Sequence, residues 1–277
     1  MMDMDIKYAS PTFLFREICT KDMPGVLQNI ASCGFDGLEL YSLFGNEARL
    51  IRETCDTLGL KVSCDHVPYE EFVSDTKRVL DERKPLELPY ITVDRIPEEK
   101  WPGTSGFSEA VDVISRIGRI CKEEGVQLLY HNHGYDLMHV VDGVPMLDLL
   151  LDAIDPALLQ FQPDLGWIAL GGGDPVHYLT KYRDRCPVIH LKDYYATAPV
   201  RMASAFVLGY KRGGKEHNFF EFRPTGYGVM NFAALMTLVL DCKPKWIVAD
   251  HDLSYERDTV EELKISLEYV KKLVSLY

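Results

Sequence analysis

Short apolar runs alternate with amphipathic stretches along this chain, and that alternation limits the folds open to it. Parallel strands need a long crossover between them, usually a helix, so repeated strand–helix units favour a parallel α/β sheet. The predicted strands cover residues 6–10, 38–41, 62–66, 90–93, 128–132, 159–164, 187–191 and 245–250.

Between these strands, apolar residues recur three and four positions apart, as in helices that cover a sheet. Asp22 and Asp174 have the character of helix N-caps. Gly34, Gly59 and Gly125 stand where a helix ends before the next strand. The predicted helices cover residues 23–34, 46–59, 72–83, 106–125, 144–154, 175–185, 231–241 and 259–277.

Eight strand–helix units in 277 residues favour one (β/α)₈ barrel over residues 1–277, since such a barrel typically needs about 250 residues. No linker rich in proline, glycine or serine divides the chain. A doubly wound open sheet is the alternative, because a local pattern does not prove that a barrel closes. In a barrel, the active site is expected at the C-terminal rim of the strands.

Residues 194–229 break the rhythm as a long loop between strand seven and helix seven, where 2–6 residues are usual. Long loops on the catalytic side are often lids or substrate walls, and an excursion that serves crystal or dimer contacts is the alternative. The segment is basic within an acidic protein. It contains five basic residues, Arg201, Lys211, Arg212, Lys215 and Arg223, and two acidic ones that oppose their charge, Glu216 and Glu221.

The composition argues against several classes of function. A net charge of −12 predicts no general attraction to DNA, RNA or anionic membranes. The acidic start lacks the basic region of a signal peptide, and no apolar run approaches the ~20 residues of a membrane span. Seven scattered cysteines without a C-x-x-C favour reduced thiols. We therefore expect a soluble, cytoplasmic protein without nucleic-acid or membrane partners; whether it forms a homo-oligomer stays open.

Acids and histidines stand repeatedly at the ends of the predicted strands. Side chains alternate across a strand, so residues two apart share a face. The residues that share a face in this way are Gln160, Gln162 and Asp164; His190 and Lys192; Asp250 and Asp252; His131 and His133; Glu39 and Tyr41; and Cys64 and His66.

Asp164, His190 and Asp250 end three successive strands and are expected to converge on one metal ion. Mixed oxygen and nitrogen ligands suit Mn²⁺, Mg²⁺, Co²⁺ or Zn²⁺. A fourth ligand would come from the strand-five region, where several residues compete. The candidates for this fourth ligand are His131, His133, Asp136 and His139. Any one of the residues in the group could, taken alone, instead be a helix cap or a hydrogen-bonded core group.

Two other residue types have both functional and structural interpretations. Glu39 could accept a substrate hydroxyl or form a structural salt bridge. Trp101, Trp167 and Trp246 could stack on a sugar ring or fill core space; of these, Trp167 is counted as a substrate-binding candidate.

The motifs as a series resemble the xylose isomerase-like TIM-barrel superfamily, which includes sugar phosphate isomerases and epimerases, inosose dehydratases and family 2 AP endonucleases. The resemblance runs in order over nearly the whole chain. It is carried by GFDGLEL, SCDHV, LLYHNHGYDL, VDGVPMLDLLL, FQPDLGWIALGGGDPVHYLTKYRDRCPVIHLKD, PTGYGVMNF and WIVADHD.

The resemblance implies a divalent metal at the C-terminal rim and proton abstraction next to a carbonyl. Asp164, His190 and Asp250 match metal ligands of the family, and so does Asp136. Asp136 and Asp250 stand where the family usually has the longer Glu, which could move the metal, admit a water or transfer acid/base work to a histidine. Residues that match the substrate pocket are His66, His133 and Lys192.

The resulting hypothesis is a sugar isomerase or epimerase that acts on a ketose, inosose or keto-sugar through a metal-stabilised enediolate. Asp250 or Asp136 removes the proton, the other acid or His133 returns it, and Lys192 stabilises the oxyanion. Glu39, His66, His131 and Trp167 complete the substrate site. The alternatives are a dehydrating or deglycosylating relative and a sugar-binding barrel without turnover. The acidic charge disfavours a DNA-repair endonuclease.

Overall fold

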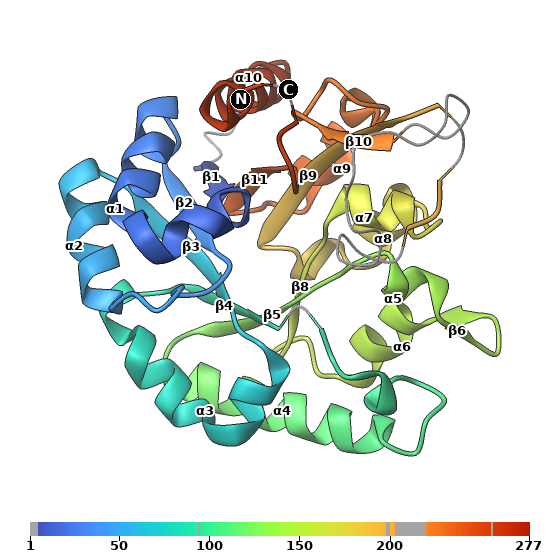
Figure 1. Ribbon diagram of the computed structural model, residues 1–277. Helices are drawn as coiled ribbons and strands as arrows, with labels where there is room; N and C mark the ends of the chain where they lie inside the picture. The colour runs from blue at the N-terminus through green and yellow to red at the C-terminus, as the bar shows by residue number, and fades with distance from the viewer. Residues whose placement is uncertain (1–4, 94, 198–199, 203–219, 256) are drawn as a thin grey trace.

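The structure, a computed structural model, describes residues 5–93, 95–197, 200–202, 220–255 and 257–277. Its principal strands, drawn as arrows at the centre of Figure 1, all run parallel to their barrel neighbours. They are β1 (Lys7–Pro11), β2 (Gly37–Leu40), β3 (Lys61–His66), β4 (Tyr90–Val93), β5 (Gln127–His131), β8 (Gln160–Gln162), β9 (Val188–Ala196) and β11 (Trp246–Asp250).

These strands form a closed wall. They pair in the order β9-β11-β1-β2-β3-β4-β5-β8. The two ends of this order meet through a parallel bridge between Asp164 and His190, beside a 2.9 Å hydrogen bond from the His190 N–H to the carbonyl of Pro163. We call this junction the β8–β9 seam. The predicted (β/α)₈ barrel is confirmed.

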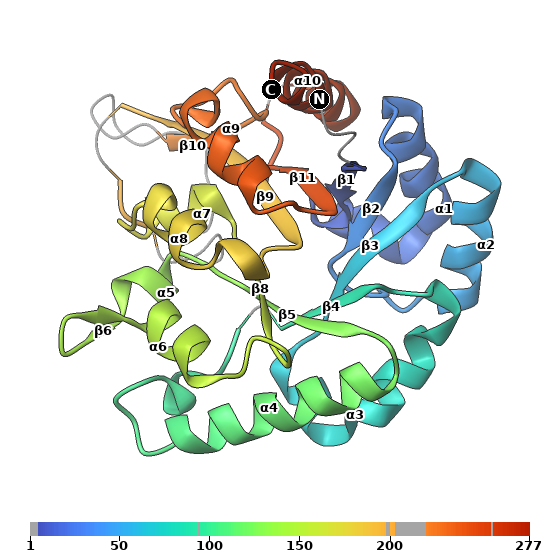
Figure 2. The same cartoon turned by 180° about the vertical axis from the view of Figure 1, so that it is seen from behind.

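Helices surround the strands on the outside of the barrel in both views (Figures 1 and 2). None of the helices in the described residues is long and apolar enough to cross a membrane. They are α1 (Arg16–Cys33), α2 (Ala48–Leu58), α3 (Tyr69–Arg83), α4 (Phe107–Glu123), α5 (Tyr135–Met138), α6 (Met146–Ala153), α7 (Leu165–Leu170), α8 (Pro175–Lys181), α9 (Phe232–Asp241) and α10 (Thr259–Val274). Short 3₁₀ turns cover η1 (Thr12–Phe15), η2 (Lys84–Leu86), η3 (Glu98–Lys100) and η4 (Arg183–Arg185).

The expected helix caps are present. Asp174 accepts a 2.9 Å hydrogen bond from the Val176 N–H at the start of α8. Asp22 accepts one of 2.9 Å from Gly25, but it does so at a kink inside α1, where its own φ and ψ are −148° and 65°. The helix therefore begins earlier than predicted, because a first helical segment precedes the one that Asp22 caps. Gly34 ends α1 with a φ of 89°, a conformation that suits glycine.

Inside the barrel, the strands supply an apolar layer below a polar one. Ala9, Cys64, Leu129, Val188, Trp246 and Val248 form a buried cluster separate from the larger one between strands and helices. Two residues further along β3, β5, β9 and β11, on the same face, the side chains are His66, His131, His190 and Asp250. The apolar layer therefore supports a polar rim at the C-terminal ends of the strands.

Strands on both sides of the seam differ from their predicted lengths. The predicted strand 159–164 is shortened to β8, because Pro163 has no N–H for a ladder and Asp164 becomes the N-cap of α7. The predicted strand 187–191 lengthens to Ala196, because β10 (Phe220–Arg223) pairs antiparallel with residues 193–196.

The segment 194–229 is therefore partly regular structure. Its described residues include the end of β9 and all of β10. Arg223 forms an ion pair with Glu221, and its guanidinium lies 5.6 Å from the Tyr195 ring centroid. Of the charged residues counted in this segment, four lie outside the described residues: Lys211, Arg212, Lys215 and Glu216.

Candidate active site

The polar rim forms a small cavity at the C-terminal end of the barrel, with a volume of about 40 Å³. Most of the residues expected from the sequence to bind substrate or metal line it, and nearly all of them are buried. The lining residues are Pro11, Phe13, Glu39, Leu40, Tyr41, His66, His131, His133, Trp167, His190, Lys192, Asp250 and Asp252.

Asp164, His190 and Asp250 converge as the strand-end pattern predicts. One ligand atom from each of these buried residues lies within 4.8 Å of the others. His190 Nδ1 is 3.0 Å from Asp250 Oδ2. Asn132 fixes the backbone of Asp164, since its side-chain oxygen accepts a 2.9 Å hydrogen bond from the Asp164 N–H. Strands β9 and β11 and the turn after β8 thus supply two carboxylates and one imidazole at one point.

The ammonium group of Lys192 lies among the carboxylates of this cluster. Its Nζ is 2.7 Å from Asp250 Oδ2, 2.7 Å from Asp252 Oδ1 and 3.5 Å from Asp164 Oδ2. The side chain is 2% exposed, and a buried cation requires such partners. Burial lowers the pKa of Lys192, but the surrounding carboxylates outweigh burial and raise it, so the group is charged.

Glu39 joins this cluster from β2. Its Oε1 lies 2.8 Å from His66 Nε2 and 2.9 Å from His190 Nε2. Burial raises the pKa of Glu39, but the charges and hydrogen bonds of the two histidines outweigh burial and bring it to about 2. Glu39 is therefore a carboxylate that holds two imidazoles at the rim.

A buried chain of hydrogen bonds orients Glu39 from below. Gln162 donates to Glu39 Oε2 over 2.6 Å, and the Thr92 hydroxyl donates to Gln162 Oε1 over 3.0 Å. Cys64 lies 2.9 Å from the same hydroxyl. Because the Glu39 carboxylate only accepts hydrogen bonds, the amide nitrogen of Gln162 faces it and the amide oxygen faces the Thr92 hydroxyl. The chain connects four strands, β3, β4, β8 and β2.

The histidines of β5 and the loop after it form an aromatic wall. The His131 ring centroid is 4.6 Å from that of His190 and 5.1 Å from that of His66. These three imidazoles form a second group whose ligand atoms lie within 4.8 Å of one another. Burial and the positive charges nearby lower the pKa of His131 well below its usual value, so it is neutral. His133 continues the wall toward Trp167, with ring centroids 5.8 Å apart.

Asp136 and His139 lie outside both of these groups. The Tyr130 hydroxyl donates to one oxygen of Asp136 over 2.6 Å, and the His133 N–H donates to the other over 2.7 Å. Asp136 thus fixes the turn that carries His133. His139 Nε2 lies 2.8 Å from the carbonyl of Pro102. Of the four residues expected to compete as a further ligand, His131 has its Nε2 3.9 Å from Asp164 Oδ2.

The three tryptophans have different environments. Trp167 lines the cavity, and its ring centroid is 5.8 Å from Lys192 Nζ. Trp101 stacks on Tyr135 at 5.6 Å and donates its indole N–H to the carbonyl of Ile96. Trp246 belongs to the apolar layer below the rim. Trp167 is therefore the tryptophan that could contact a ligand in the rim cavity.

Sequence reasoning did not assign four residues that the structure brings into the cluster: Asp252, Gln162, Thr92 and Asn132. A signal existed for the first two, because Asp252 shares a face with Asp250 and Gln162 with Asp164. Thr92 lies inside β4, on the same face as Tyr90, in a strand that carries no acid or histidine. Asn132 acts through a loop backbone, which a strand pattern does not describe.

The donor set fits a divalent cation. It offers carboxylate oxygen and imidazole nitrogen, which suit such ions, and Asp164 Oδ2 is buried without a hydrogen bond from any described residue. Burial raises the pKa of Asp164, with a further rise from Asp250, to about 7. Burial lowers the pKa of His190, but Glu39 and Asp250 raise it to about 10. A protonated imidazole cannot bind a metal, so His190 would have to lose its proton to solvent when a metal binds.

A parallel eight-stranded barrel with carboxylates, imidazoles and an ammonium group at its C-terminal rim defines a class: a TIM barrel with a buried polar cluster at the end of the barrel where TIM-barrel active sites lie. Within that class, the family model described as xylose isomerase-like TIM barrel matches residues 27–273. The chain belongs to this family.

Individual relatives agree with this membership. The chain is 29% identical over 192 residues to an inosose dehydratase of Geobacillus kaustophilus, and the match covers 61% of each protein. A sugar phosphate isomerase/epimerase of Parabacteroides distasonis superposes with a TM-score of 0.73 at 21% identity, covering 96% of this chain and 98% of that one. The IolI protein, solved with a zinc atom, gives 0.70 at 13% identity, covering 98% and 99%. The two structures show the shared fold.

Proposed function

We propose that this protein is a divalent-metal-dependent enzyme that moves a proton next to the carbonyl of a ketose, inosose or keto-sugar, and so isomerises or epimerises it. The observation that carries the proposal is the convergence of Asp164, His190 and Asp250 at the barrel rim, with Lys192 2.7 Å from Asp250. This places oxygen and nitrogen donors beside a fixed positive charge, as the chemistry of an enolising enzyme requires.

Asp164, His190 and Asp250 would hold the metal, which when bound supplies a Lewis acid for the substrate carbonyl. Lys192 offers its ammonium protons to the oxygen that gains negative charge. The Asp250 carboxylate accepts the proton from the carbon next to the carbonyl. His133, which lines the cavity and whose turn Asp136 fixes, returns a proton to the sugar.

The remaining lining residues suit a polyhydroxylated substrate. Glu39, His66 and His131 present a carboxylate and two imidazoles to the cavity, and these groups can exchange hydrogen bonds with hydroxyls. Trp167 offers a flat apolar surface to the C–H face of a sugar ring. Asp136 has a supporting role in this proposal, because both of its oxygens already accept hydrogen bonds.

A dehydratase is the second candidate, and two observations favour it. The relative from Geobacillus kaustophilus is an inosose dehydratase. Asp252 lies 2.7 Å from Lys192, and its pKa is raised by burial, with a smaller rise from Asp250. A carboxyl group that keeps its proton more readily could protonate a departing hydroxyl after the same first proton abstraction.

The test is a hydrogen-exchange assay in D₂O with Mn²⁺-loaded protein and a panel of ketoses, inososes and 3-keto-sugars. We expect deuterium at the carbon next to the carbonyl of at least one substrate. Inversion of the stereocentre next to the carbonyl identifies an epimerase, and a shift of the carbonyl to that carbon identifies an isomerase. Loss of one water identifies a dehydratase. If the loaded protein exchanges none of them, the proposal is wrong.

The test variant is His190→Ala. Its matched control is His139→Ala, because His139 lies outside both groups of ligand residues and its Nε2 is within hydrogen-bond distance of the Pro102 carbonyl. We expect His190→Ala to lose bound metal, measured by elemental analysis, and turnover together, with an unchanged circular dichroism spectrum. His139→Ala should retain both. Full exchange activity in His190→Ala without metal would refute the proposed role of His190.

A further inference from the structure

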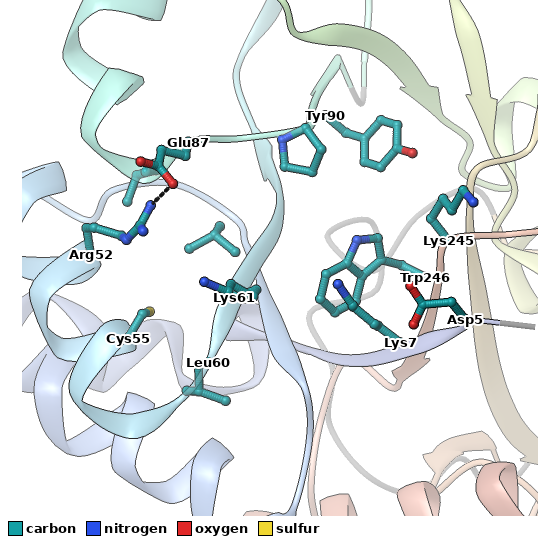
Figure 3. Close-up of a pocket in the computed structure, with 13 residues that line it drawn as sticks. Asp5, Lys7, Arg52, Cys55, Leu60, Lys61, Glu87, Tyr90, Lys245 and Trp246 are labelled. Carbon is teal, nitrogen blue, oxygen red and sulfur yellow. Dashed lines mark ion pairs between the residues drawn. The ribbon is translucent and has the colours of Figure 1, made fainter.

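A larger cavity, of about 330 Å³, lies at the opposite end of the barrel from the rim. Figure 3 shows it where β1, β3, β4 and β11 begin, beside α2 and the residues that follow η2. Its volume is within the range of small-molecule sites. Its lining residues are Asp5, Lys7, Arg52, Cys55, Leu60, Lys61, Val62, Leu86, Glu87, Pro89, Tyr90, Lys245 and Trp246.

The charge of this cavity is opposite to that of the protein. The lining contains four basic residues and only two carboxylates, in a chain whose net charge is −12. The basic residues are Lys7, Arg52, Lys61 and Lys245. One of these carboxylates is neutralised, because Arg52 Nη1 lies 2.6 Å from Glu87 Oε2. The cavity therefore carries an excess of two positive charges.

Three of these cations are available to a ligand. Within the described ranges, the ammonium groups of Lys7, Lys61 and Lys245 form no ion pair and no hydrogen bond to another residue. They occupy equivalent places in the fold, because Lys7 and Lys61 begin β1 and β3, and Lys245 precedes β11. Parallel strands begin at the same end of a barrel, so the fold puts these three side chains around the same cavity.

Trp246 closes the inner end of the cavity. Lys7 Nζ lies 5.7 Å from the centroid of its ring, so this ammonium group lies over the indole. Gly37 makes room for the ring, because a Cβ there would come within 2.8 Å of it. With Tyr90, Val62 and the other apolar lining residues, the indole gives the cavity an apolar side next to its cations.

We propose that this cavity binds the phosphate monoester of a small organic molecule. A phosphate monoester carries about −1.5 to −2 charges at neutral pH, which matches the excess of positive charge, and its terminal oxygens can accept hydrogen bonds from ammonium groups that line the cavity. The apolar side accommodates the carbon skeleton. This site is separate from the rim and does not depend on the proposed function.

Indole N–H signals in ¹H–¹⁵N spectra provide the test, since the chain has three tryptophans, one of them at each end of the barrel. The Trp246 signal is assigned from Trp246→Phe and the Trp167 signal from Trp167→Phe. The probes are glucose 6-phosphate, inorganic phosphate and glucose, each titrated to millimolar concentration. We expect glucose 6-phosphate to shift the Trp246 signal in a saturable manner, phosphate to do so more weakly, and glucose to leave it unchanged.

The combined variant Lys7→Gln, Lys61→Gln and Lys245→Gln should weaken binding of glucose 6-phosphate by about tenfold or more, as the loss of three ion pairs implies. The matched control changes three exposed lysines elsewhere: Lys21→Gln, Lys122→Gln and Lys272→Gln. It should bind as the unchanged protein does. A Trp246 signal that no probe shifts, an equal loss in both triple variants, or a response of Trp167 alone would overturn the proposal.

Discussion

Gln162 shows how one uncharged side chain determines the state of a buried acid. Its amide nitrogen donates to Glu39 Oε2 over 2.6 Å, and its amide oxygen accepts from the Thr92 hydroxyl over 3.0 Å. The other oxygen of Glu39 is then directed at His66 and His190. A buried carboxylate that loses one donor pays a desolvation cost, so a neutral residue matters here as much as a charged one.

We therefore expect Gln162→Leu to lower the free energy of unfolding by about 1–3 kcal/mol, the usual cost of leaving a buried polar group without its partner. Urea unfolding measures this change. Gln160→Leu is the matched control, since Gln160 is on the same face of β8, two residues earlier, and is only half-buried. An equal loss in both variants would contradict a specific role for the bond to Glu39.

At the scale of elements, α6 and α8 are joined by two carboxylates of α6, the buried Asp148 and the exposed Asp152. Asp148 of α6 accepts hydrogen bonds from Tyr178 over 2.7 Å, from Tyr182 over 2.9 Å and from Lys181 over 2.6 Å. Burial raises the pKa of Asp148, but these hydrogen bonds outweigh burial and lower it below its ordinary value. The ionised form is therefore the one that joins the helices.

This lowered pKa predicts a pH dependence of stability. A carboxyl with a lower pKa in the folded state stabilises the fold at pH values above its unfolded pKa of about 3.9, and this contribution is lost as the pH falls through the folded pKa. Asp148→Asn should cost about 1 kcal/mol at pH 7 and progressively less below pH 4. Urea unfolding at several pH values measures the change. Asp152→Asn, on the same helix and 54% exposed, should cost less at pH 7.

The sequence predicted the elements better than it predicted their ends. Hydrophobic periodicity located the eight strands of the barrel, because burial on both faces leaves an apolar run. It did not predict that β9 extends to Ala196, since that extension depends on pairing with β10, which lies far along the chain. It also did not predict the kink at Asp22 inside α1.

The candidate site was predictable where it follows from strand register. Asp164, His190 and Asp250 lie on or directly after neighbouring parallel strands, and the order of those strands brings them together. Asp136 illustrates the limit: its position after β5 suggests the same rim, but the turn of α5 directs its carboxylate to Tyr130 and to the His133 N–H. The direction of a side chain in a loop depends on local hydrogen bonds that a period of two does not describe.

At the scale of the whole molecule, the β8–β9 seam is the shortest strand pairing in the barrel wall, since a single bridge forms it. Asp164 and His190 form that bridge and also belong to the candidate metal group. A ligand that binds only the folded protein raises its stability by mass action. Metal bound by these residues would join β8 and β9, so it should act on the seam more than on the rest of the wall.

We expect Mn²⁺ or Zn²⁺ to raise the melting temperature and to slow amide exchange at the His190 N–H, which bonds to Pro163 across the seam. Exchange at the Ile91 N–H, in the middle of the wall on β4, serves as the internal control. Equal slowing at both positions, or no change at His190 in a protein shown to hold metal, would count against a link between metal and seam.

The seam has a further consequence for how this protein could lose its chemistry. The same two residues are both a joint in the wall and part of the reactive cluster. Any fluctuation that parts β8 from β9 therefore disassembles the donor set before the rest of the barrel unfolds. Heat or denaturant should inactivate the protein while most of its helices are still intact, so that residual activity is an earlier and more sensitive measure of damage than secondary structure.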